Sequence, residues 1–501
     1  MEKSRTRRAK LNMLTTILRQ VLATLCGIVI PKVMISTFGS VVYGATTSIA
    51  QFLSYVALFE GGIGRVVRGE LYQHLAEGNK TQISKIHQAT KAFFRGVGVF
   101  FVVYTVILAL SYFDIADITV FDRRYTFGLV VAISLSTMAN YFGGIGNMTL
   151  MHADQKQYLT NTVITVTNVI NTVCIVLLVQ LDADVLTVKL ISSIVFIFRP
   201  LFYAAYVKKH YALPRVQKDP AVLSQKWTGM GQHVAYFLHT NTDIVMLTLL
   251  ADLKLVAVYS VYHLVVSSIW NIASSFSGGM EAAFGDMIAK KEQSDLRQSY
   301  GKYKFIITLV ALVLFGCTAT LILPFIKIYL EDVSDADYIQ PLFAMILICA
   351  EFLNCLALPC TTLPISANRL KQTRWGSYGE ALINITVSLC LIQWNPLLGV
   401  AIGTLAATVF KCVYYLIYSA RQIIRCSLWR VLGRFVATTV VMAAISLVGM
   451  GLMNNVPMKN FWSFGCWGVL TFLAVSLVSL IFCAAVFPED MKNLFGKKRA
   501  K

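Results

Sequence analysis

The chain has 501 residues, of which 56% are hydrophobic and only 14% are charged. Soluble domains carry about 25% charged residues, so this composition excludes a string of soluble domains and indicates a polytopic membrane protein. The formal charge of +19 would suggest nucleic-acid binding in a soluble protein, but here the placement of the basic residues favours contacts to anionic membrane lipid and no nucleic acid.

A helix needs about 20 mainly apolar residues to cross the hydrocarbon core of a bilayer. The sequence predicts fourteen such helices, and the fold class is therefore an all-α integral membrane protein. In chain order they lie at residues 11–37, 42–64, 90–112, 126–150, 158–180, 184–207, 230–252, 255–279, 303–329, 338–362, 375–395, 397–421, 430–454 and 462–487.

The distribution of Lys and Arg tests this arrangement, because short cytoplasmic loops retain positive residues. With the N-terminus inside, 33 of the 44 Lys and Arg residues fall in inside segments and four fall in outside loops. This asymmetry persists along the whole chain. The sequence therefore predicts a multi-pass protein with both termini in the cytoplasm.

A charged connector containing Pro214 and Pro220 follows the sixth predicted helix. It divides the chain into two six-helix bundles, and since six is even, both bundles enter the membrane in the same orientation, as in transporters built from parallel repeats. We expect the bundles to be pseudosymmetric. The predicted regions are an N-terminal bundle at 1–207, a cytoplasmic linker at 208–229, a C-terminal bundle at 230–421, and helices 13 and 14 with a basic cytoplasmic tail at 422–501.

Ionisable side chains at membrane depth cost about 2.5 to 3.5 kcal/mol each on insertion scales, so they normally face protein or a water-filled cavity. Five of the seven candidates are basic, which favours an anionic, phosphate-bearing substrate, since guanidinium groups bind phosphate through paired hydrogen bonds. Lys32 and Lys189 are near outer helix ends, where they can reach the headgroups. The seven are Arg19, Lys32, Lys189, Arg199, Asp243, Glu351 and Lys411.

Three of these positions are informative. Arg19 lies about 12 Å along its predicted helix from the inner end. Arg199 precedes Pro200, and both cavity lining and extension to the headgroups stay open for it. Asp243 shares a helix face with His239, four residues earlier, which fits either an interhelical hydrogen-bond cluster or a coupling site.

Catalytic signatures and nucleotide-binding loops are missing from the sequence, and its eleven cysteines lack the spacing of metal ligands. We therefore expect a transporter that is not an enzyme, without a cofactor or metal.

The segments around the second, seventh and twelfth predicted helices resemble a known family. The run Tyr55-Val56-Ala57-Leu58-Phe59-Glu60-Gly61-Gly62-Ile63-Gly64, followed by Arg68, is similar to the N-terminal signature of the O-antigen type of polysaccharide-biosynthesis flippases. Asp243-Ile244-Val245-Met246-Leu247 and Gly399-Val400-Ala401-Ile402-Gly403-Thr404 resemble later helices of the same family. One departure is Glu60, where the family commonly has Asp.

This resemblance implies the multidrug/oligosaccharidyl-lipid/polysaccharide exporter fold, with a central cavity and alternating access. It also implies a flippase that moves an undecaprenyl-pyrophosphate-linked oligosaccharide from the inner to the outer leaflet of the bacterial cytoplasmic membrane for surface polysaccharide assembly. Glycosyltransferases or a polysaccharide polymerase are the expected partners. Arg19, Arg199 and Lys411 are the predicted substrate-binding residues, and Asp243, His239 and Glu351 are the candidates for coupling or gating.

Two alternatives stay open. The first is an ion-coupled exporter of small molecules or drugs with the same fold, in which Asp243 and Glu351 would carry the cation. The second is a membrane-embedded glycosyltransferase or polymerase. That enzyme would be expected to have a catalytic extramembrane domain, and the longest predicted outer loop, at residues 113–125, is too short for one.

Overall fold

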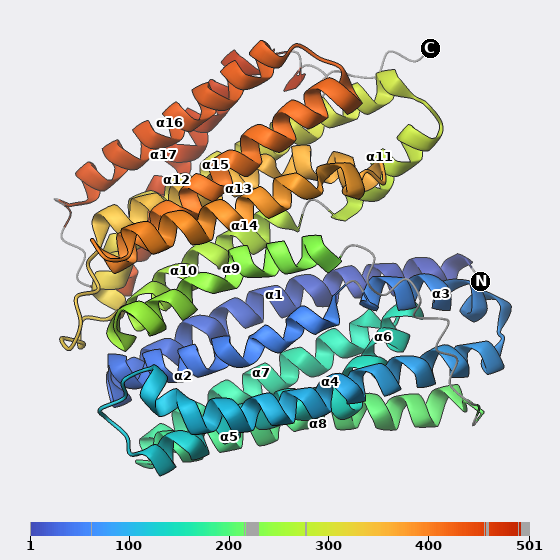
Figure 1. Cartoon of the computed structure of the whole chain (residues 1–501). Coiled ribbons are helices and arrows are strands. Elements are labelled where there is room, and N and C mark those ends of the chain that lie inside the picture. The colour runs from blue at the N-terminus through green and yellow to red at the C-terminus, as the bar shows by residue number, and fades with distance from the viewer. Residues whose placement is uncertain are drawn as a thin grey trace. The chain divides into compact units, whose positions relative to one another are not determined.

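The structure is a computed structural model that describes residues 2–61, 63–214, 216, 230–275, 278–454, 456, 460–488, 490 and 491. Most of the predicted linker, at 217–229, and the basic tail from residue 492 lie outside the described residues. Within the described ranges the regular secondary structure is helical, and no strand occurs (Figure 1). The all-α prediction is therefore confirmed.

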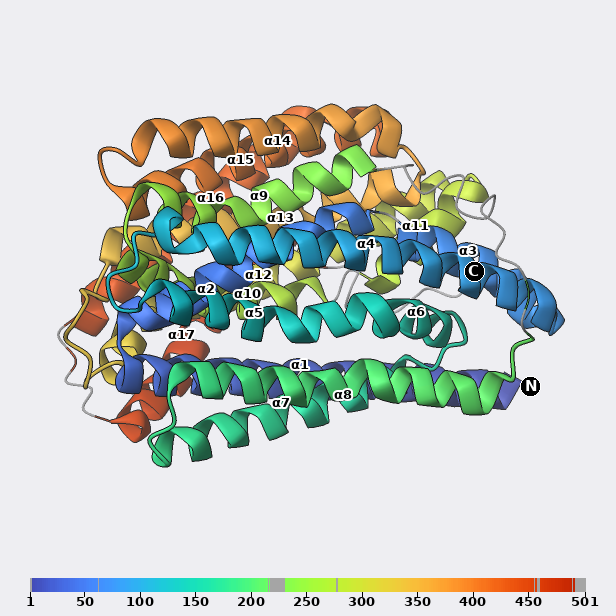
Figure 2. The same cartoon turned by 60° about the horizontal axis from the view of Figure 1, so that its bottom comes forward.

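The chain divides into two compact units, which are described separately. Unit 1 comprises residues 1–237 and 252–257. In this unit α7 packs against both α1 and α8 (Figure 2). Helices α1 and α7 run in the same direction, because Asn12 and Thr16 of α1 contact Tyr158 and Asn161 of α7 in that order. The elements are α1 (Glu2–Phe38), α2 (Ser40–Ser54), η1 (Tyr55–Glu60), α3 (Ile63–Glu77), α4 (Lys80–Ile115), α5 (Arg123–Ala139), η2 (Asn140–Gly144), α6 (Ile145–Ala153), α7 (Gln157–Gln180) and α8 (Val185–Tyr211).

Unit 2 comprises residues 238–251 and 258–501, so α9 and α10 contribute residues to both units. In unit 2 the last two helices, α16 and α17, both pack against α12. The elements are α9 (Met230–Leu250), α10 (Leu253–Ser274), α11 (Gly278–Ala289), α12 (Gln293–Tyr329), α13 (Pro341–Ser366), α14 (Leu370–Leu391), α15 (Pro396–Tyr418), η4 (Ser419–Ile424), α16 (Leu428–Asn454) and α17 (Phe461–Val486).

All fourteen predicted stretches coincide with helices. Twelve helical segments among the described residues are long and apolar enough to cross a membrane by length and composition. The other two predicted spans, 230–252 and 375–395, correspond to α9 and α14, whose mean hydropathy is reduced by polar residues. These are the helices that carry the buried acids of unit 2, so their lower hydropathy marks the candidate site.

The outer faces of the helices carry apolar side chains that a soluble protein would bury. On α17, Val469, Leu473 and Leu477 are 59 to 61% exposed, and such a continuous apolar surface indicates contact with lipid. Tryptophans mark the two ends of α14 in the same unit. Trp375 and Trp394 are 63 and 72% exposed, as expected for side chains at the headgroup level of a bilayer.

Several helices extend beyond the predicted spans. The predicted connector at 280–302 contains most of α11 and the first turns of α12, and the segment before the third predicted helix contains α3 and the start of α4. These parts are polar on one face, so a search for apolar stretches does not detect them. They lengthen α4 and α12 to 36 and 37 residues, longer than the bilayer alone requires.

Side-chain caps fix where several helices begin. An Asn or Asp side chain accepts a hydrogen bond from a backbone N–H in the first turn, which satisfies a donor that has no partner within the helix. The capping residues are Asn79 for α4, Asp122 for α5, Asp184 for α8, Asn395 for α15 and Asn460 for α17. Such caps contribute about 1 kcal/mol each, and they fix the residue at which each helix begins.

The helix predicted at 126–150 is interrupted by the π-helical turn Asn140–Gly144. The Gly143-Gly144 pair ends this turn, at the boundary with α6. A Cβ on Gly144 would come within 3.2 Å of the Pro200 ring, so the two helix irregularities are packed against each other. Arg199, a predicted site residue, directly precedes Pro200. The π-helical turn and the proline therefore both lie close to Arg199.

The turn between α14 and α15 requires a residue without a side chain at position 399. A Cβ on Gly399 would lie 2.7 Å from the backbone nitrogen of Ile392, which is too close for any tetrahedral carbon. We expect Gly399→Ala to lower the thermal unfolding midpoint of the purified protein, because relief of this overlap costs about 1 to 3 kcal/mol. Gly451→Ala is the matched control, since nothing lies within 4 Å of its added Cβ. Equal midpoints for the two variants would contradict this account of the turn.

Candidate functional site

In unit 1, Arg199 is held at membrane depth by neutral groups of the neighbouring helix. Its Nε donates to Thr167 Oγ1 at 2.7 Å, and its Nη2 donates to Asn168 Oδ1 at 2.6 Å. The Phe196 ring lies 4.2 Å from the guanidinium carbon. These contacts orient the guanidinium and replace part of its hydration, but none of them cancels its charge.

Arg19 lies in the same part of unit 1. Tyr203 is within electrostatic range of Arg199 and Arg19, and His152 is within range of Arg68 and Arg19. Helices α1, α3, α6 and α8 therefore contribute to one basic region. The Nε of Arg19 and the hydroxyl of Tyr203 are buried without a hydrogen-bond partner among the described residues. Two donor groups at this region are therefore available to a ligand.

This group, the basic cluster, consists of Arg19, Arg68, His152, Arg199 and Tyr203. No acidic side chain in the described part of the chain forms an ion pair with its three arginines. Uncompensated positive charge in surroundings poor in water attracts anions strongly, and guanidinium groups suit phosphate because they donate paired hydrogen bonds. The cluster is therefore suited chemically to a phosphate-bearing group.

Unit 2 carries buried charges of both signs. Glu380 Oε1 is 3.0 Å from Lys411 Nζ and 3.1 Å from His239 Nε2, and these side chains are only 5 to 13% exposed. Lys411 also donates to Asn354 Oδ1 at 3.1 Å, and Asn354 donates to Glu351 Oε2 at 3.1 Å. This chain of contacts, the ion-pair layer, joins α9, α13, α14 and α15.

A second set of polar groups lies beside the ion-pair layer. Asp243 Oδ2 accepts hydrogen bonds from Tyr259 at 2.8 Å and Thr404 at 3.0 Å, and Thr404 in turn accepts one from Asn384 at 3.0 Å. Asp243 and Asn384 each lie four residues beyond a member of the ion-pair layer, His239 and Glu380, and therefore one helical turn away. We call this set, with Ser388, the acceptor layer.

The acceptor layer contains buried oxygens with no partner among the described residues. They are Asp243 Oδ1, Asn384 Oδ1 and Ser388 Oγ. Carboxylate, amide and hydroxyl oxygens are the ligands that hard cations prefer. Because a buried acceptor without a partner costs about 1 to 3 kcal/mol, three of them at adjacent positions indicate a site for a small cation or water.

The predicted site residues thus fall into two groups. Arg19 and Arg199 belong to the basic cluster, whereas Asp243, His239, Glu351 and Lys411 lie together in unit 2. The polar face predicted at His239 and Asp243 meets protein, since both residues are at most 7% exposed. The ammonium of Lys411, predicted to bind substrate, is engaged by an acid and an amide.

Sequence analysis missed several of the residues that complete these groups. Glu380 carries the central carboxylate of the ion-pair layer, yet the predicted span placed it near a helix end; α14 begins at Leu370, so Glu380 is about 15 Å along the helix. Tyr203 and Ser388, whose hydroxyls are buried without a partner among the described residues, are also absent from the predicted site. A residue-by-residue search of the polar spans for ionisable and hydroxyl groups would have found all three.

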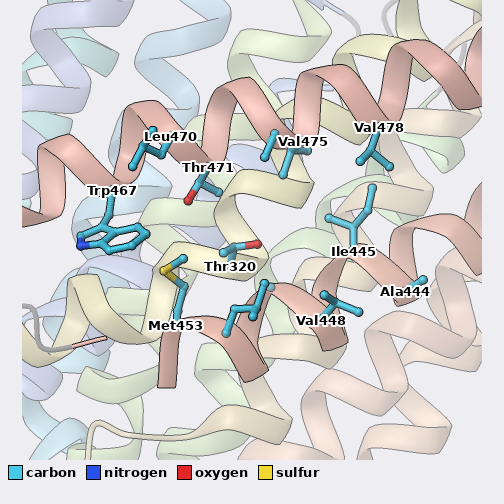
Figure 3. A pocket seen from close by; sticks show the side chains of 13 residues that line it. Thr320, Ala444, Ile445, Val448, Met453, Trp467, Leu470, Thr471, Val475 and Val478 are labelled. Atoms are coloured by element: carbon cyan, nitrogen blue, oxygen red, sulfur yellow. The ribbon is translucent and has the colours of Figure 1, made fainter. Parts of the chain in front are cut away.

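An apolar groove runs between α12, α16 and α17 of unit 2 (Figure 3). Its volume is about 500 Å³, and the side chains of Thr320 and Thr471 are its only hydroxyl-bearing ones. Such a lining accommodates a hydrocarbon chain and offers little to a polar ligand. It is formed by Thr320, Ala444, Ile445, Val448, Gly449, Leu452, Met453, Trp467, Leu470, Thr471, Ala474, Val475 and Val478.

No protein-family model matches the sequence, and no curated protein matches it either. Solved structures are similar in fold. The lipid II flippase MurJ in an inward closed conformation has a TM-score of 0.69 at 13% identity, covering 96% of this chain and 99% of that chain. The MATE multidrug transporter DinF-BH has a TM-score of 0.61 at 15% identity, covering 83% of this chain and 97% of that chain.

A MATE family transporter of the MOP superfamily, in an inward-facing conformation, has a TM-score of 0.59 at 12% identity, covering 79% of this chain and 95% of that chain. These likenesses span nearly the whole of the solved chains, so this protein has the MurJ and MATE fold. The likeness confirms the expected all-helical membrane fold. The division into two pseudosymmetric six-helix bundles and two C-terminal helices stays a prediction. Membership of the O-antigen type in particular stays a prediction.

The balance of charges in the ion-pair layer predicts how its members respond to substitution. Lys411→Met leaves Glu380 without its ammonium partner, and breaking a buried pair in this way costs about 3 to 5 kcal/mol. The double variant Lys411→Met with Glu380→Gln removes both charges, and we expect it to unfold at a higher temperature than the single variant. Thermal unfolding of the purified proteins measures both. A double variant less stable than Lys411→Met would show that the pair is not the main stabilising contact of Glu380.

Proposed function

We propose that the protein is a flippase that moves a lipid-linked oligosaccharide, with a pyrophosphate between lipid and sugar, from the inner to the outer leaflet by alternating access. The observation that carries the proposal is the basic cluster of unit 1. An uncompensated set of guanidinium groups at membrane depth is costly unless a ligand uses it. A pyrophosphate has the charge and the acceptor oxygens to do so.

Unit 2 by itself contains an apolar groove whose lining suits a hydrocarbon chain. A lipid-linked oligosaccharide has a long hydrocarbon tail that gains nothing by entering a polar cavity, and the groove offers that tail an apolar surface. The fold shared with a lipid II flippase is consistent with this assignment. The proposed partners are the enzymes that assemble and polymerise the oligosaccharide, and the proposed location is the bacterial cytoplasmic membrane with both termini inside.

Transport against a gradient requires a source of free energy, and we propose that a monovalent cation in the acceptor layer supplies it. Asp243 provides the negative charge, while Asn384 and Ser388 add neutral oxygens. A single carboxylate with neutral oxygens matches a monovalent cation better than a divalent one, because the bound charge is then balanced.

The second candidate function is an ion-coupled exporter of small molecules, which the likeness to a MATE multidrug transporter favours. A cationic drug would need carboxylates left free for it. In unit 2, however, Glu380 is paired with Lys411, and Glu351 is hydrogen-bonded by Asn354. The carboxylates of Glu380 and Glu351 are therefore engaged within the protein, and the uncompensated arginines of unit 1 fit an anionic substrate better than a cationic one.

The flippase proposal is tested at Arg19. We expect Arg19→Ala to abolish export, so that lipid-linked oligosaccharide accumulates in the cytoplasmic leaflet and the surface polysaccharide is lost, while the protein reaches the membrane at normal levels. Arg19→Lys should recover export only in part, because an ammonium cannot form the paired hydrogen bonds of a guanidinium.

The control is Arg421→Ala, since Arg421 is exposed on η4 outside the basic cluster. Wild-type export by Arg19→Ala at normal membrane levels would show that Arg19 does not hold the substrate. Deletion of the gene gives the broader test. An unchanged surface polysaccharide with no intermediate in the inner leaflet would refute the flippase assignment itself.

The cation proposal is tested by thermal shift of the purified protein. Na⁺ should raise the unfolding midpoint of the wild type relative to choline, by the usual linkage of binding to stability, and Asp243→Asn should abolish this increase. Asp295→Asn is the control, because Asp295 is an exposed acid in the first turn of α12. A Na⁺ response that survives in Asp243→Asn would place the cation elsewhere.

A further inference from the structure

Two buried features of unit 2 lie one helical turn apart, and each attracts positive charge. The acceptor layer presents Asp243 Oδ1 and two neutral oxygens without partners among the described residues. The ion-pair layer presents the His239 ring, whose Nε2 lies 3.1 Å from Glu380 and whose Nδ1 is buried with no partner in the same described part of the chain. Because Nε2 faces a carboxylate oxygen, the neutral tautomer with its proton on Nε2 is favoured, and a further proton would add at Nδ1.

Acidic side chains outnumber basic ones around His239. Lys411 and Glu380 cancel each other, and Glu351 and Asp243 remain as carboxylates when ionised. Other titratable groups beside this region are Tyr259 and His263 on α10, which stack on each other with ring centroids 5.5 Å apart. The thiols of Cys355 on α13 and Cys412 on α15 also lie beside it. None of these groups adds positive charge while His263 is neutral. The two layers together therefore have room for further positive charge.

We propose that His239 is a proton-binding site that competes electrostatically with the cation of the acceptor layer, so that proton uptake weakens cation binding and cation binding releases a proton. This inference rests on the cation coupling proposed above. His239 and Asp243 are four residues apart on one helix face, which places their side chains about 6 Å from each other. Two unit charges at that distance repel each other strongly in protein surroundings.

The size of this competition follows from Coulomb's law. At about 6 Å and an effective dielectric constant of about 20, the repulsion weakens cation binding up to about a hundredfold. Linkage requires the effect to be reciprocal, so a bound cation must weaken proton binding by the same factor. Histidine is the side chain whose charge ordinarily changes within the physiological pH range, which makes His239 the natural partner for such an exchange.

Glu380 and Lys411 act here as positioning residues. The same carboxylate oxygen of Glu380 pairs with both His239 and Lys411, so the imidazole is held with Nε2 toward Glu380 and Nδ1 away from it. Without this contact the ring could turn and the proton would have no fixed location relative to Asp243. Because Lys411 balances Glu380, the pair orients His239 without adding net charge.

The experiment is a Na⁺ titration of the purified full-length protein at pH 8, 7 and 6. The thermal unfolding midpoint is measured at each Na⁺ concentration and gives the half-saturating concentration. In the wild type, the half-saturating Na⁺ concentration should rise at least tenfold from pH 8 to pH 6. In His239→Gln, whose amide can still donate to Glu380 but does not titrate, the rise should be smaller by about tenfold. Only direct competition of protons for Asp243 then remains. His263→Gln, which changes the other histidine of unit 2, should behave like the wild type.

A second measurement uses the wild type alone, in case His239→Gln does not fold. Addition of Na⁺ in weakly buffered solution near pH 7 should release protons, detected with an indicator dye, whereas choline should release none. The same pH dependence in His239→Gln and wild type, or no proton release by the wild type, would overturn the role of His239 while cation coupling stands. Absence of any Na⁺ response in the wild type at pH 8 would instead refute the coupling proposal on which this inference rests.

Discussion

A charged side chain inside a bilayer has to be surrounded by protein groups that replace water, and this constraint decides how both units are built. In unit 2, Glu380 meets it by pairing one oxygen with both His239 and Lys411. In unit 1, Arg199 meets it with the neutral groups of Thr167 and Asn168. The difference matters for function, because a neutral neighbour leaves the charge of the arginine available, whereas an acidic neighbour cancels the charge of the lysine.

The two bundles therefore share a plan but differ in electrostatics. Arg199 and Lys411 lie at nearly the same distance from the start of α8 and α15, the sixth predicted helix of each bundle. In each case the preceding predicted helix, α7 or α14, supplies a partner. The partner is an amide in one bundle and a carboxylate in the other. Under the proposed function, this difference in one side-chain type leaves a positive charge available for an anion in unit 1 and cancels the corresponding charge in unit 2.

Much of the fold could be predicted from the sequence, because an apolar stretch of about 20 residues reports directly on the thickness of the bilayer. The fourteen stretches coincide with helices, and the amphipathic segments α3 and α11 were missed because their apolar residues are interrupted by polar ones. The site was harder. The depth of Arg19 and the shared face of His239 and Asp243 follow from helical spacing alone.

The partners of these residues do not follow from spacing. Glu380 and Lys411 are separated by a turn, and their contact depends on the register of α14 against α15, which is fixed by close packing at residues such as Gly399. The register between antiparallel helices depends on how many side chains of both helices fit together. Residue spacing within a single helix therefore does not predict it. The apolar groove could not be predicted from spacing either, because its lining comes from three helices, α12, α16 and α17, that are separate in the sequence.

The tryptophans that flank α14 also make the protein sensitive to its lipid surroundings. From Trp375 to the end of α14 at Leu391 the helix rises about 24 Å, and Trp394 lies three residues beyond that end. This span is comparable to the roughly 30 Å of an average hydrocarbon core. In a bilayer several ångströms thicker, α14 would have to straighten or the lipids would have to compress around it, and in a thinner one it would tilt. Because α14 carries Glu380 and Asn384, such a tilt would move both toward or away from their partners on α9 and α15. Membrane thickness thereby becomes a variable that acts directly on the buried polar contacts of unit 2.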